Sequence, residues 1–265
     1  MALPQPEPNS TCLVTGASSG IGADIARELA RRGHNVVLSA RREERLRELA
    51  VELGDSGVRA DVIACDVTDA DSRASLIGEI DELGLEVEVL VNNAGYGSGG
   101  PFHELDGDAE VRMVRTNCEA VVAFCAEYVP RMVERRRGAI LNVGSTAGYQ
   151  PLPRQATYSA SKAFVNNFSD ALYADLGGTG VTVTSLRPGP VATEFGEAAG
   201  MEDEFSSLPS FVVDTSQEIA AAAVEGLERG KRVVAPGIVG RLAVAGHYAP
   251  RGVLLTALRR FYPVK

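Results

Sequence analysis

The chain has 265 residues, of which 45% are hydrophobic and 23% charged, and its formal net charge at pH 7 is −9. This length fits one large hydrophobic core better than two ordinary domains, and the composition excludes a disordered or fibrous chain. An acidic chain without a clustered basic stripe also argues against a nucleic-acid partner, because phosphate binding draws most of its affinity from Lys and Arg.

The first residues and the cysteines indicate neither secretion nor a metal site. Residues 1–10, MALPQPEPNS, are Pro-rich and polar, so we expect a flexible tail without the apolar run of a signal peptide. The four cysteines form no CxxC pair and the three histidines lack ligand spacing, which predicts no metal. No stretch approaches the about 18 apolar residues of a membrane span, so we find no firm membrane signal and expect a cytoplasmic protein.

Short apolar runs alternate with longer amphipathic segments from residue 11 onward. Continuous apolar runs are typical of parallel strands that helices cover on both faces. We therefore predict an α/β fold: a single-domain, Rossmann-type, doubly wound parallel sheet of about seven strands, over residues 11–235. The two longest helices are expected near residues 108–136 and 157–176. The apolar runs are TCLVT, NVVLS, VIAC, VEVLV, AILNV, VTVTSL and KRVVAP.

A glycine-rich turn follows the first predicted strand. The sequence TGASSGIG, Thr15 to Gly22, leads into a helix marked by Ile21, Ile25 and Leu29. In such a turn Gly20 lets backbone approach a pyrophosphate, which the helix N-terminus attracts. The spacing G-x-x-x-G-x-G departs from the common G-x-G-x-x-G pattern, so the turn alone supports dinucleotide binding and a structural βα turn about equally.

The end of the second predicted strand favours a phosphorylated ribose. An NAD site usually has Asp or Glu there, whereas this sequence has Arg41 and Arg42. A guanidinium can hold a 2′-phosphate through charge-assisted hydrogen bonds, so the pattern favours NADP(H) over NAD(H). The alternative is that both arginines are solvated residues before a helix. Asp66 could accept a hydrogen bond from the adenine amino group, or cap a helix beginning near Thr68.

Tyr158 and Lys162, in YSASK, lie four residues apart near the start of a predicted helix. This spacing places both side chains on one helix face. A free phenol, with a pKa of about 10, is a poor acid–base catalyst at neutral pH, and a nearby ammonium stabilises the phenolate and lowers that value. The pair therefore suggests proton transfer by the tyrosine.

Taken together, these motifs resemble the classical short-chain dehydrogenase/reductase family over residues 11–193. The resemblance is carried by TGASSGIG, NNAG at Asn92 to Gly95, Asn117, Ser145, YSASK and PGPVAT, in that order. It implies that Tyr158 exchanges the proton with the carbonyl or hydroxyl oxygen, and that Ser145 hydrogen-bonds the same oxygen. It also implies that Lys162 binds the nicotinamide ribose and lowers the tyrosine pKa, and that Asn117 holds a water-linked proton relay.

The resemblance implies a set of cofactor contacts around the carboxyl ends of the strands, where doubly wound sheets bind ligands. Ser18 and Ser19 stand where many NADP-preferring members have a basic residue, so the cofactor preference depends mainly on Arg41. We expect Ser145, Tyr149 and Tyr158 to contact the substrate. The expected cofactor contacts are Gly16, Ser18, Ser19, Gly20, Ile21, Gly22, Arg41, Arg42, Asp66, Val67, Asn92, Asn93, Ala94, Gly95, Tyr158, Lys162, Pro188, Gly189, Val191 and Thr193.

The predicted function is that of an NADP(H)-dependent oxidoreductase that interconverts a carbonyl and a secondary alcohol on a small molecule. The alternatives are an NAD-dependent alcohol or steroid-type dehydrogenase, and a non-catalytic scaffold that senses NADP(H). By analogy we expect a homodimer or homotetramer formed through the two long helices. Residues 189–214 suggest a cover over the site. Residues 236–265 predict a helical extension of the same domain that could cap the pocket, form an interface or lie on a membrane surface.

Overall fold

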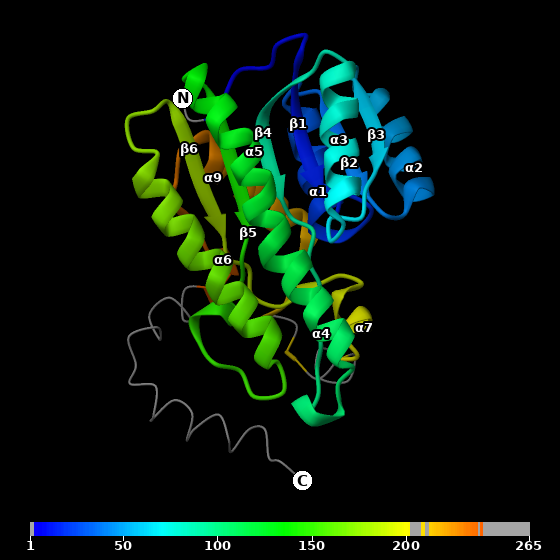
Figure 1. The fold of residues 1–265 in the computed structure, drawn as a ribbon, viewed down its shortest axis with the longest axis vertical. Helices are drawn as coiled ribbons and strands as arrows, with labels where there is room; N and C mark the ends of the chain where they lie inside the picture. The colour runs from blue at the N-terminus through cyan, green and yellow to red at the C-terminus, as the bar shows by residue number, and fades with distance from the viewer. Residues whose placement is uncertain (1–2, 202–207, 210–211, 238, 241–265) are drawn as a thin grey trace.

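Seven parallel strands form one sheet in the order β3-β2-β1-β4-β5-β6-β9 (Figure 1). The computed structural model describes residues 3–201, 208–209, 212–237 and 239–240. The reversal of strand order at β1 and β4 is that of a doubly wound sheet, which confirms the predicted fold class. The strands are β1 Ser10–Thr15, β2 Val36–Ala40, β3 Ala60–Ala64, β4 Glu86–Asn92, β5 Gly138–Val143, β6 Val181–Leu186 and β9 Val233–Val234.

Helices cover both faces of this sheet, as the continuous apolar strands require. One core packs α1 (Gly20–Arg31), α2 (Glu43–Gly54) and α9 (Ser216–Glu228) against one face. The other core packs α3 (Ala70–Glu82), α5 (Ala120–Glu134) and α6 (Ala156–Asp175) against the opposite face. Figure 1 shows α3, α5 and α6 in front of the sheet, with α1 and α9 behind it.

The helix expected over residues 108–136 is present but is not a uniform α-helix. It consists of α4 (Gly107–Val114), a π-helical turn η2 (Arg115–Glu119) and α5. Single π-helical turns inside helices are frequent at functional sites, because the extra residue reorients nearby side chains. Here the turn contains Asn117, whose exposure is 1%. The helix expected at 157–176 is confirmed as α6, within one residue at each end.

Shorter elements gather at the carboxyl ends of the strands. Two 3₁₀ turns, η1 (Phe102–Glu104) and η3 (Thr146–Tyr149), follow β4 and β5. The cover expected over 189–214 contains β7 (Val191–Ala192), α7 (Phe195–Ala198) and the first residue of β8 (Asp214–Thr215), and it falls partly outside the described residues. The predicted helical extension, 236–265, also lies outside them except at 236, 237, 239 and 240.

Contacts fix the segment before β1, where the sequence predicts a flexible tail. Leu3 is 5% exposed within the core. The amide of Asn35 donates to the carbonyl oxygens of Glu7 and Pro8, at 3.4 and 3.2 Å, and Arg137 donates to that of Gln5 at 2.6 Å. These contacts, together with a strand that begins at Ser10, replace the tail with an anchored segment from residue 3. None of the helices in the described part of the chain is long and apolar enough to cross a membrane.

Two helical glycines allow a matched test of the packing of α9 on the sheet. A Cβ on Gly226, in α9, would lie 2.2 Å from Cγ2 of Val234, whereas a Cβ on Gly78, in α3, would meet no atom within 4 Å. We expect Gly226→Ala to lower the free energy of unfolding by about 1–3 kcal/mol through overpacking. Gly78→Ala should raise it by about 0.5–1 kcal/mol, because alanine favours the helix. Urea denaturation measures both, and equal effects would contradict the close approach of α9 to β9.

Candidate active site

The predicted phosphate-binding turn joins β1 to α1 with a backbone suited to an anion. Gly16 and Gly20 have φ of +68° and +57°, which only glycine adopts without strain. Ser19 is the N-cap of α1, but its side chain makes no capping hydrogen bond, and the first turn of α1 contains no acidic residue. The N-terminal dipole of α1 is therefore uncompensated by side chains, as a phosphate site requires.

Asn93 and Thr15 tie this turn to the end of β4. The amide of Asn93 donates to the carbonyl oxygens of Thr15 and Gly16, at 2.9 and 3.1 Å. The hydroxyl of Thr15 accepts from the backbone N–H groups of Asn93 and Ala94, both at 3.1 Å. A Cβ on Gly22 would lie 2.3 Å from Asn93 Nδ2, so only glycine fits at that position of α1. The turn and the β4 end thus form one close-packed unit.

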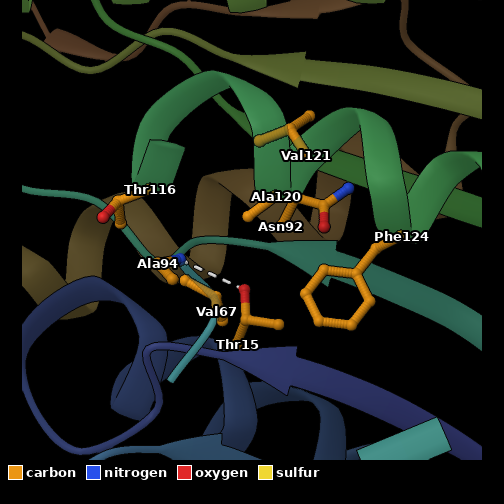
Figure 2. Close-up of a pocket in the computed structure, with 8 residues that line it drawn as sticks. All are labelled: Thr15, Val67, Asn92, Ala94, Thr116, Ala120, Val121 and Phe124. Atoms are coloured by element: carbon orange, nitrogen blue, oxygen red, sulfur yellow. Dashed lines mark hydrogen bonds between the residues drawn. The ribbon is translucent and has the colours of Figure 1, made fainter. Parts of the chain in front are cut away.

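The side chain of Asn92, which the sequence predicts to line the nucleotide groove, is buried against β5 and α5. Its side chain donates to Asn142 Oδ1 at 2.9 Å, and its exposure is 3%. Asn92 is the last residue of β4, and consecutive side chains of a strand point to opposite faces of the sheet. The Asn92 side chain therefore points towards α5, whereas the side chain of Asn93 reaches the glycine turn. Figure 2 shows Asn92 among the residues that line a hollow between β4 and α5. The hollow is lined by Thr15, Val67, Asn92, Ala94, Thr116, Ala120, Val121 and Phe124.

The two arginines after β2 have different surroundings. Arg42 donates to the hydroxyls of Ser18 and Ser19, at 3.1 and 2.7 Å, and pairs with Glu194 at 2.9 Å. Arg41 is exposed and makes no hydrogen bond or ion pair with any residue that the structure describes. Arg41 is therefore available to an incoming anion, whereas Arg42 already bridges the glycine turn to the segment after β7.

Arg45 and Glu194 belong to this cluster and were missed from the sequence. Arg45 pairs with Glu194 at 2.5 Å, and hydrogen bonds from Arg45 and then Arg42 lower the pKa of the Glu194 carboxyl to about 2. Arg45 lies one helical turn after Arg41, a spacing that could have revealed it. Glu194 could not be found in this way, because it comes from a segment about 150 residues further along the chain.

Asp66 takes part in a local turn. Its Oδ1 accepts from the backbone N–H of Thr68 at 2.9 Å and from the Thr68 hydroxyl at 2.7 Å. Burial raises the pKa of Asp66, but these hydrogen bonds outweigh it and lower the pKa below its ordinary value. The helix cap expected here is instead Asp69, whose side chain accepts from Asp71 N as α3 begins. A contact of Asp66 with adenine stays a prediction.

Tyr158, Ser145 and Lys162 meet where β5 and α6 come together. Burial raises the pKa of the Tyr158 phenol to about 12, while a side-chain hydrogen bond with Ser145 acts to lower it. The Nζ atom of Lys162 lies 5.9 Å from the centre of the Tyr158 ring and donates to the carbonyl oxygen of Val143 at 2.8 Å. Burial lowers the pKa of Lys162 to about 8.

The direction of the Tyr158 shift differs from the sequence expectation of a pKa lowered by Lys162. Both groups are buried, and burial disfavours the charged form of each. Because the pKa of Lys162 is about 8 and that of Tyr158 about 12, the lysine loses its proton before the phenol ionises. At pH 7 a lysine with a pKa of about 8 is still mostly an ammonium, so Lys162 loses its charge only above that pH.

Asn117 lies beside this cluster, facing away from solvent. Its side-chain amide donates to the backbone oxygen of Tyr96 at 3.0 Å and to the Ser161 hydroxyl at 2.9 Å. A Cβ on Gly95 would lie 3.1 Å from Asn117 Oδ1 and 3.4 Å from Lys162 Nζ. The end of β4 therefore brings Gly95 against both side chains, and the four residues of the predicted tetrad lie around one edge of the sheet.

The segment after β6 closes this edge. Gly20 of the phosphate turn approaches Thr193, since a Cβ there would lie 3.1 Å from Thr193 Cγ2. The ring of Phe195 packs on Tyr158 with 5.2 Å between centroids. A Cβ on Gly97 would lie 2.6 Å from the Phe195 ring, so the loop after β4 also packs under α7. The predicted contacts Pro188 to Thr193 thus follow β6 along the same edge as the glycine turn.

Comparison with known proteins agrees with this arrangement. Residues 10–204 match the short chain dehydrogenase family. The chain belongs to the short-chain dehydrogenase/reductase family. It is 43% identical over 185 residues to sulfoacetaldehyde reductase 2 of Chromohalobacter salexigens, covering 69% of this chain and 73% of that protein.

Two further relatives show the same family and fold. The NADP-dependent 3-hydroxy acid dehydrogenase YdfG of Escherichia coli is 40% identical over 185 residues, with 69% of this chain and 73% of the relative covered. A short-chain dehydrogenase from Sphingobium yanoikuyae, solved in complex with NADPH, superposes with a TM-score of 0.79 at 33% identity. That superposition covers 97% of this chain and 96% of the other. The protein is thus an oxidoreductase by family.

Burial of Lys162 in this short-chain dehydrogenase/reductase predicts a pH effect on stability. A lysine titrates at about 10.4 in the unfolded chain, and at about 8 in the folded one. The folded-state pKa of Lys162 is depressed, so this residue does not destabilise the fold above pH about 10.4. As the pH falls from about 10.4 towards 8, it lowers the free energy of unfolding by about 1.4 kcal/mol per pH unit. Urea denaturation without nucleotide should show Lys162→Met gaining stability over the wild type at the lower pH. A pH-independent difference between the two proteins would contradict this.

Proposed function

We propose that the protein is an NADP(H)-dependent oxidoreductase that interconverts a carbonyl and a secondary alcohol, with Tyr158 as the general acid and base. One observation carries this proposal: the buried Tyr158 phenol lies close enough to the Ser145 hydroxyl for that hydroxyl to act on its pKa, at the edge of the sheet that holds the glycine turn. A hydroxyl pair at that edge can contact the oxygen of a substrate beside a bound dinucleotide.

The residues around the turn fit NADP(H). The glycine positions form a cradle that a side chain would fill, since a Cβ on Gly16 would lie 2.8 Å from Ala94 Cα. The uncapped N-terminus of α1 suits the pyrophosphate, and the exposed guanidinium of Arg41 suits a 2′-phosphate. The names of the relatives, NADP-dependent in one and NADPH-complexed in another, support the same cofactor.

Each residue of the cluster has a role in the proposed reaction. The nicotinamide, when bound, supplies or accepts the hydride. Tyr158 gives its proton to the carbonyl oxygen in reduction and removes the hydroxyl proton in oxidation. Because its pKa is raised, the phenol is protonated at neutral pH and can act as the acid in reduction. Ser145 holds the same oxygen through its hydroxyl. Lys162 and Asn117, both next to Gly95, hold the ribose and orient a proton relay.

The alternative of an NAD-dependent dehydrogenase has one feature in its favour. Glu194 places a carboxylate with a pKa of about 2 among the arginines that follow β2. A negative charge there repels a 2′-phosphate. It is, however, neutralised by Arg42 and Arg45, whereas Arg41 forms no ion pair with any described residue. The balance of charges therefore favours NADP(H).

The substrate proposed is a small carbonyl compound held by Ser145, Tyr149 and Tyr158. The two curated relatives differ by name in what they act on, a sulfonated aldehyde and a 3-hydroxy acid. The Phe195 ring against Tyr158 favours an apolar group next to the reacting carbonyl. An absorbance screen with an aryl ketone, an aliphatic aldehyde, a 3-oxo ester and sulfoacetaldehyde tests the reaction class.

Assembly and location stay predictions. The outer faces of the helices proposed to form a homodimer or homotetramer expose apolar side chains, which supports an interface there. Cytoplasmic location rests on the sequence alone. The exposed apolar residues of α4, α5 and α6 are Val111, Val114, Val122, Phe164 and Tyr173.

Replacing the catalytic hydroxyl gives the direct test. Tyr158→Phe should lower kcat by about 10²- to 10⁴-fold, because the general acid is lost. Its NADPH affinity, measured by fluorescence titration, should stay within about threefold, because the hydroxyl serves proton transfer and not cofactor binding. The matched control is Tyr173→Phe, since Tyr173 lies on the same helix with 39% exposure. Wild-type turnover in Tyr158→Phe would refute the proposed function.

Cofactor preference depends on one guanidinium. Arg41→Ala should weaken NADPH binding by about 10- to 100-fold and leave NADH binding within about twofold, because only NADPH has the 2′-phosphate. Arg47→Ala is the control, since Arg47 is an exposed residue of α2 paired with Glu43. Equal losses for the two cofactors would contradict the phosphate contact.

A further inference from the structure

A second buried cation lies next to the catalytic cluster without a part in the chemistry above. Among the residues that the structure describes, one lysine and one arginine are buried: Lys162 is 6% exposed and Arg187 is 4% exposed. Arg187 directly follows β6, and its backbone N–H donates to Val234 of β9 at 2.7 Å. Burying a guanidinium carries a large desolvation cost, so its contacts indicate what it does.

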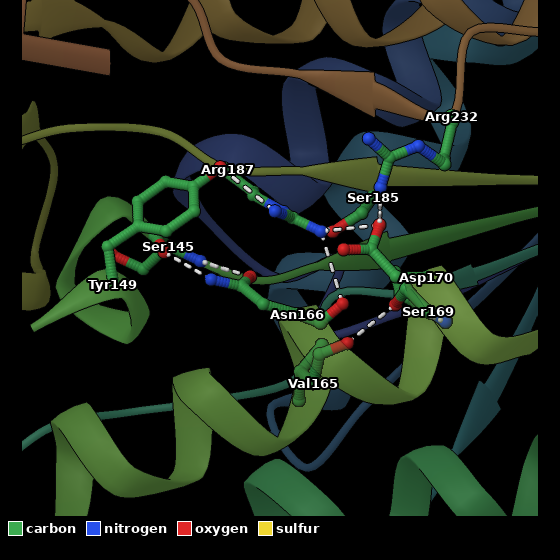
Figure 3. A network of polar contacts seen from close by, with 10 residues as sticks. Ser145, Tyr149, Val165, Asn166, Ser169, Asp170, Ser185, Arg187 and Arg232 are labelled. Carbon is green, nitrogen blue, oxygen red and sulfur yellow. Dashed lines mark hydrogen bonds and ion pairs between the residues drawn. The ribbon is translucent and has the colours of Figure 1, made fainter. Parts of the chain in front are cut away.

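The Arg187 side chain is held on every nitrogen. Its Nε donates to the Ser185 hydroxyl at 2.9 Å, and Nη1 donates to the Tyr149 hydroxyl at 2.9 Å. Its Nη2 donates to the backbone oxygen of Asn166 at 3.1 Å and pairs with Asp170 at 2.8 Å. Figure 3 shows this guanidinium between the Tyr149 ring and the α6 residues Asn166 and Asp170.

From Asn166 the network reaches Ser145. The side-chain amide of Asn166 donates to the backbone oxygen of Ser145 at 2.9 Å, and its oxygen accepts from Ser145 N at 3.4 Å (Figure 3). The residue after Arg187 adds a second route, since the carbonyl oxygen of Pro188 accepts from Thr146 N at 2.9 Å and from the Ser145 hydroxyl at 3.4 Å. Ser145 is therefore fixed from both sides.

Tyr149 marks the opposite end of the same turn. Ser145 is the N-cap of η3, and Tyr149 is its last residue. The Arg187 guanidinium donates to the Tyr149 hydroxyl and also lies 5.3 Å from the centre of its ring. One side chain thus holds, directly or through Asn166, both ends of the short turn that carries the two residues expected at the substrate.

We propose that Arg187 is a positioning residue for the reaction: it fixes η3 so that the Ser145 hydroxyl and the Tyr149 ring keep one placement relative to Tyr158. This inference rests on the proposed function, because it gives Ser145 and Tyr149 their roles at the substrate. Small displacements of such groups are expensive, since a shift of about 1 Å can lower a rate by about 100-fold.

A purely structural role explains the network less well. A buried ion pair adds little net stability compared with apolar side chains of similar volume. Asp170 does not depend on Arg187 for its charge balance, because the half-exposed Arg232 also pairs with it, at 2.5 Å. What Arg187 alone provides is a planar set of donors directed at two different segments, which a lysine cannot reproduce.

The test compares two arginines that share Asp170. Arg187→Lys should lower kcat by about 10- to 100-fold while leaving the NADPH dissociation constant within about twofold, because η3 moves and the glycine turn does not. Arg232→Lys should keep wild-type kcat. NADPH binding stoichiometry gives the folded fraction, and kcat is expressed per binding site, using whichever of the four carbonyl compounds above reacts fastest. An unchanged kcat in Arg187→Lys, or an equal loss in both variants, would overturn the proposal.

Two further variants keep the outcome unambiguous. Arg187→Met preserves the side-chain stem and should show the same loss of kcat if Arg187→Lys does not fold. If neither variant binds NADPH, the guanidinium is a folding requirement and the proposal is wrong.

Tyr149→Phe should change kcat less in the Arg187→Lys background than in the wild type, because the contact between residues 187 and 149 is already lost. Additive effects would contradict positioning through Tyr149. Full activity of Tyr158→Phe would instead overturn the proposed function itself.

Discussion

The parallel pairing of β1 with β4 is the constraint on which the site depends. These strands are adjacent in the sheet although 78 residues separate Thr15 from Asn93. Their carboxyl ends are joined by hydrogen bonds between those two residues, and this places the glycine turn beside the loop that begins with Ala94 and Gly95. Gly95 in turn lies against Asn117 and Lys162. The end of β4 therefore contacts both the glycine turn and the catalytic cluster.

Burial sets the electrostatics of the catalytic cluster. It raises the pKa of Tyr158 and lowers that of Lys162, and so moves both groups towards their neutral forms. The nearby Ser145 hydroxyl acts against the rise of the phenol pKa. The same low-dielectric surroundings strengthen the buried hydrogen bonds of Asn117 and Asn166.

Charge is distributed differently at the two ends of the groove. At the nucleotide end, Arg42 and Arg45 bind Glu194, a residue of the segment that follows β7, so that segment is tied to α2. At the chemical end, Arg187 is buried and binds η3 and α6. Arginine suits both places, because its planar fork can contact two segments at once. The exposed pairs contribute little stability, whereas the buried guanidinium of Arg187 is also held by hydrogen bonds on each of its nitrogens.

The sequence alone determined the features that have a local cause: the continuous apolar strands, the glycine turn, and the four-residue spacing that puts Tyr158 and Lys162 on one face of α6. Only the tertiary structure decided the rest. The π-helical turn at Asn117, the inward direction of Asn92, and the raised pKa of Tyr158 arise from packing between elements distant in the chain. Such contacts depend on how segments pack in three dimensions and on the desolvation cost of each buried polar group. Neither can be read from the spacing of residues along the chain.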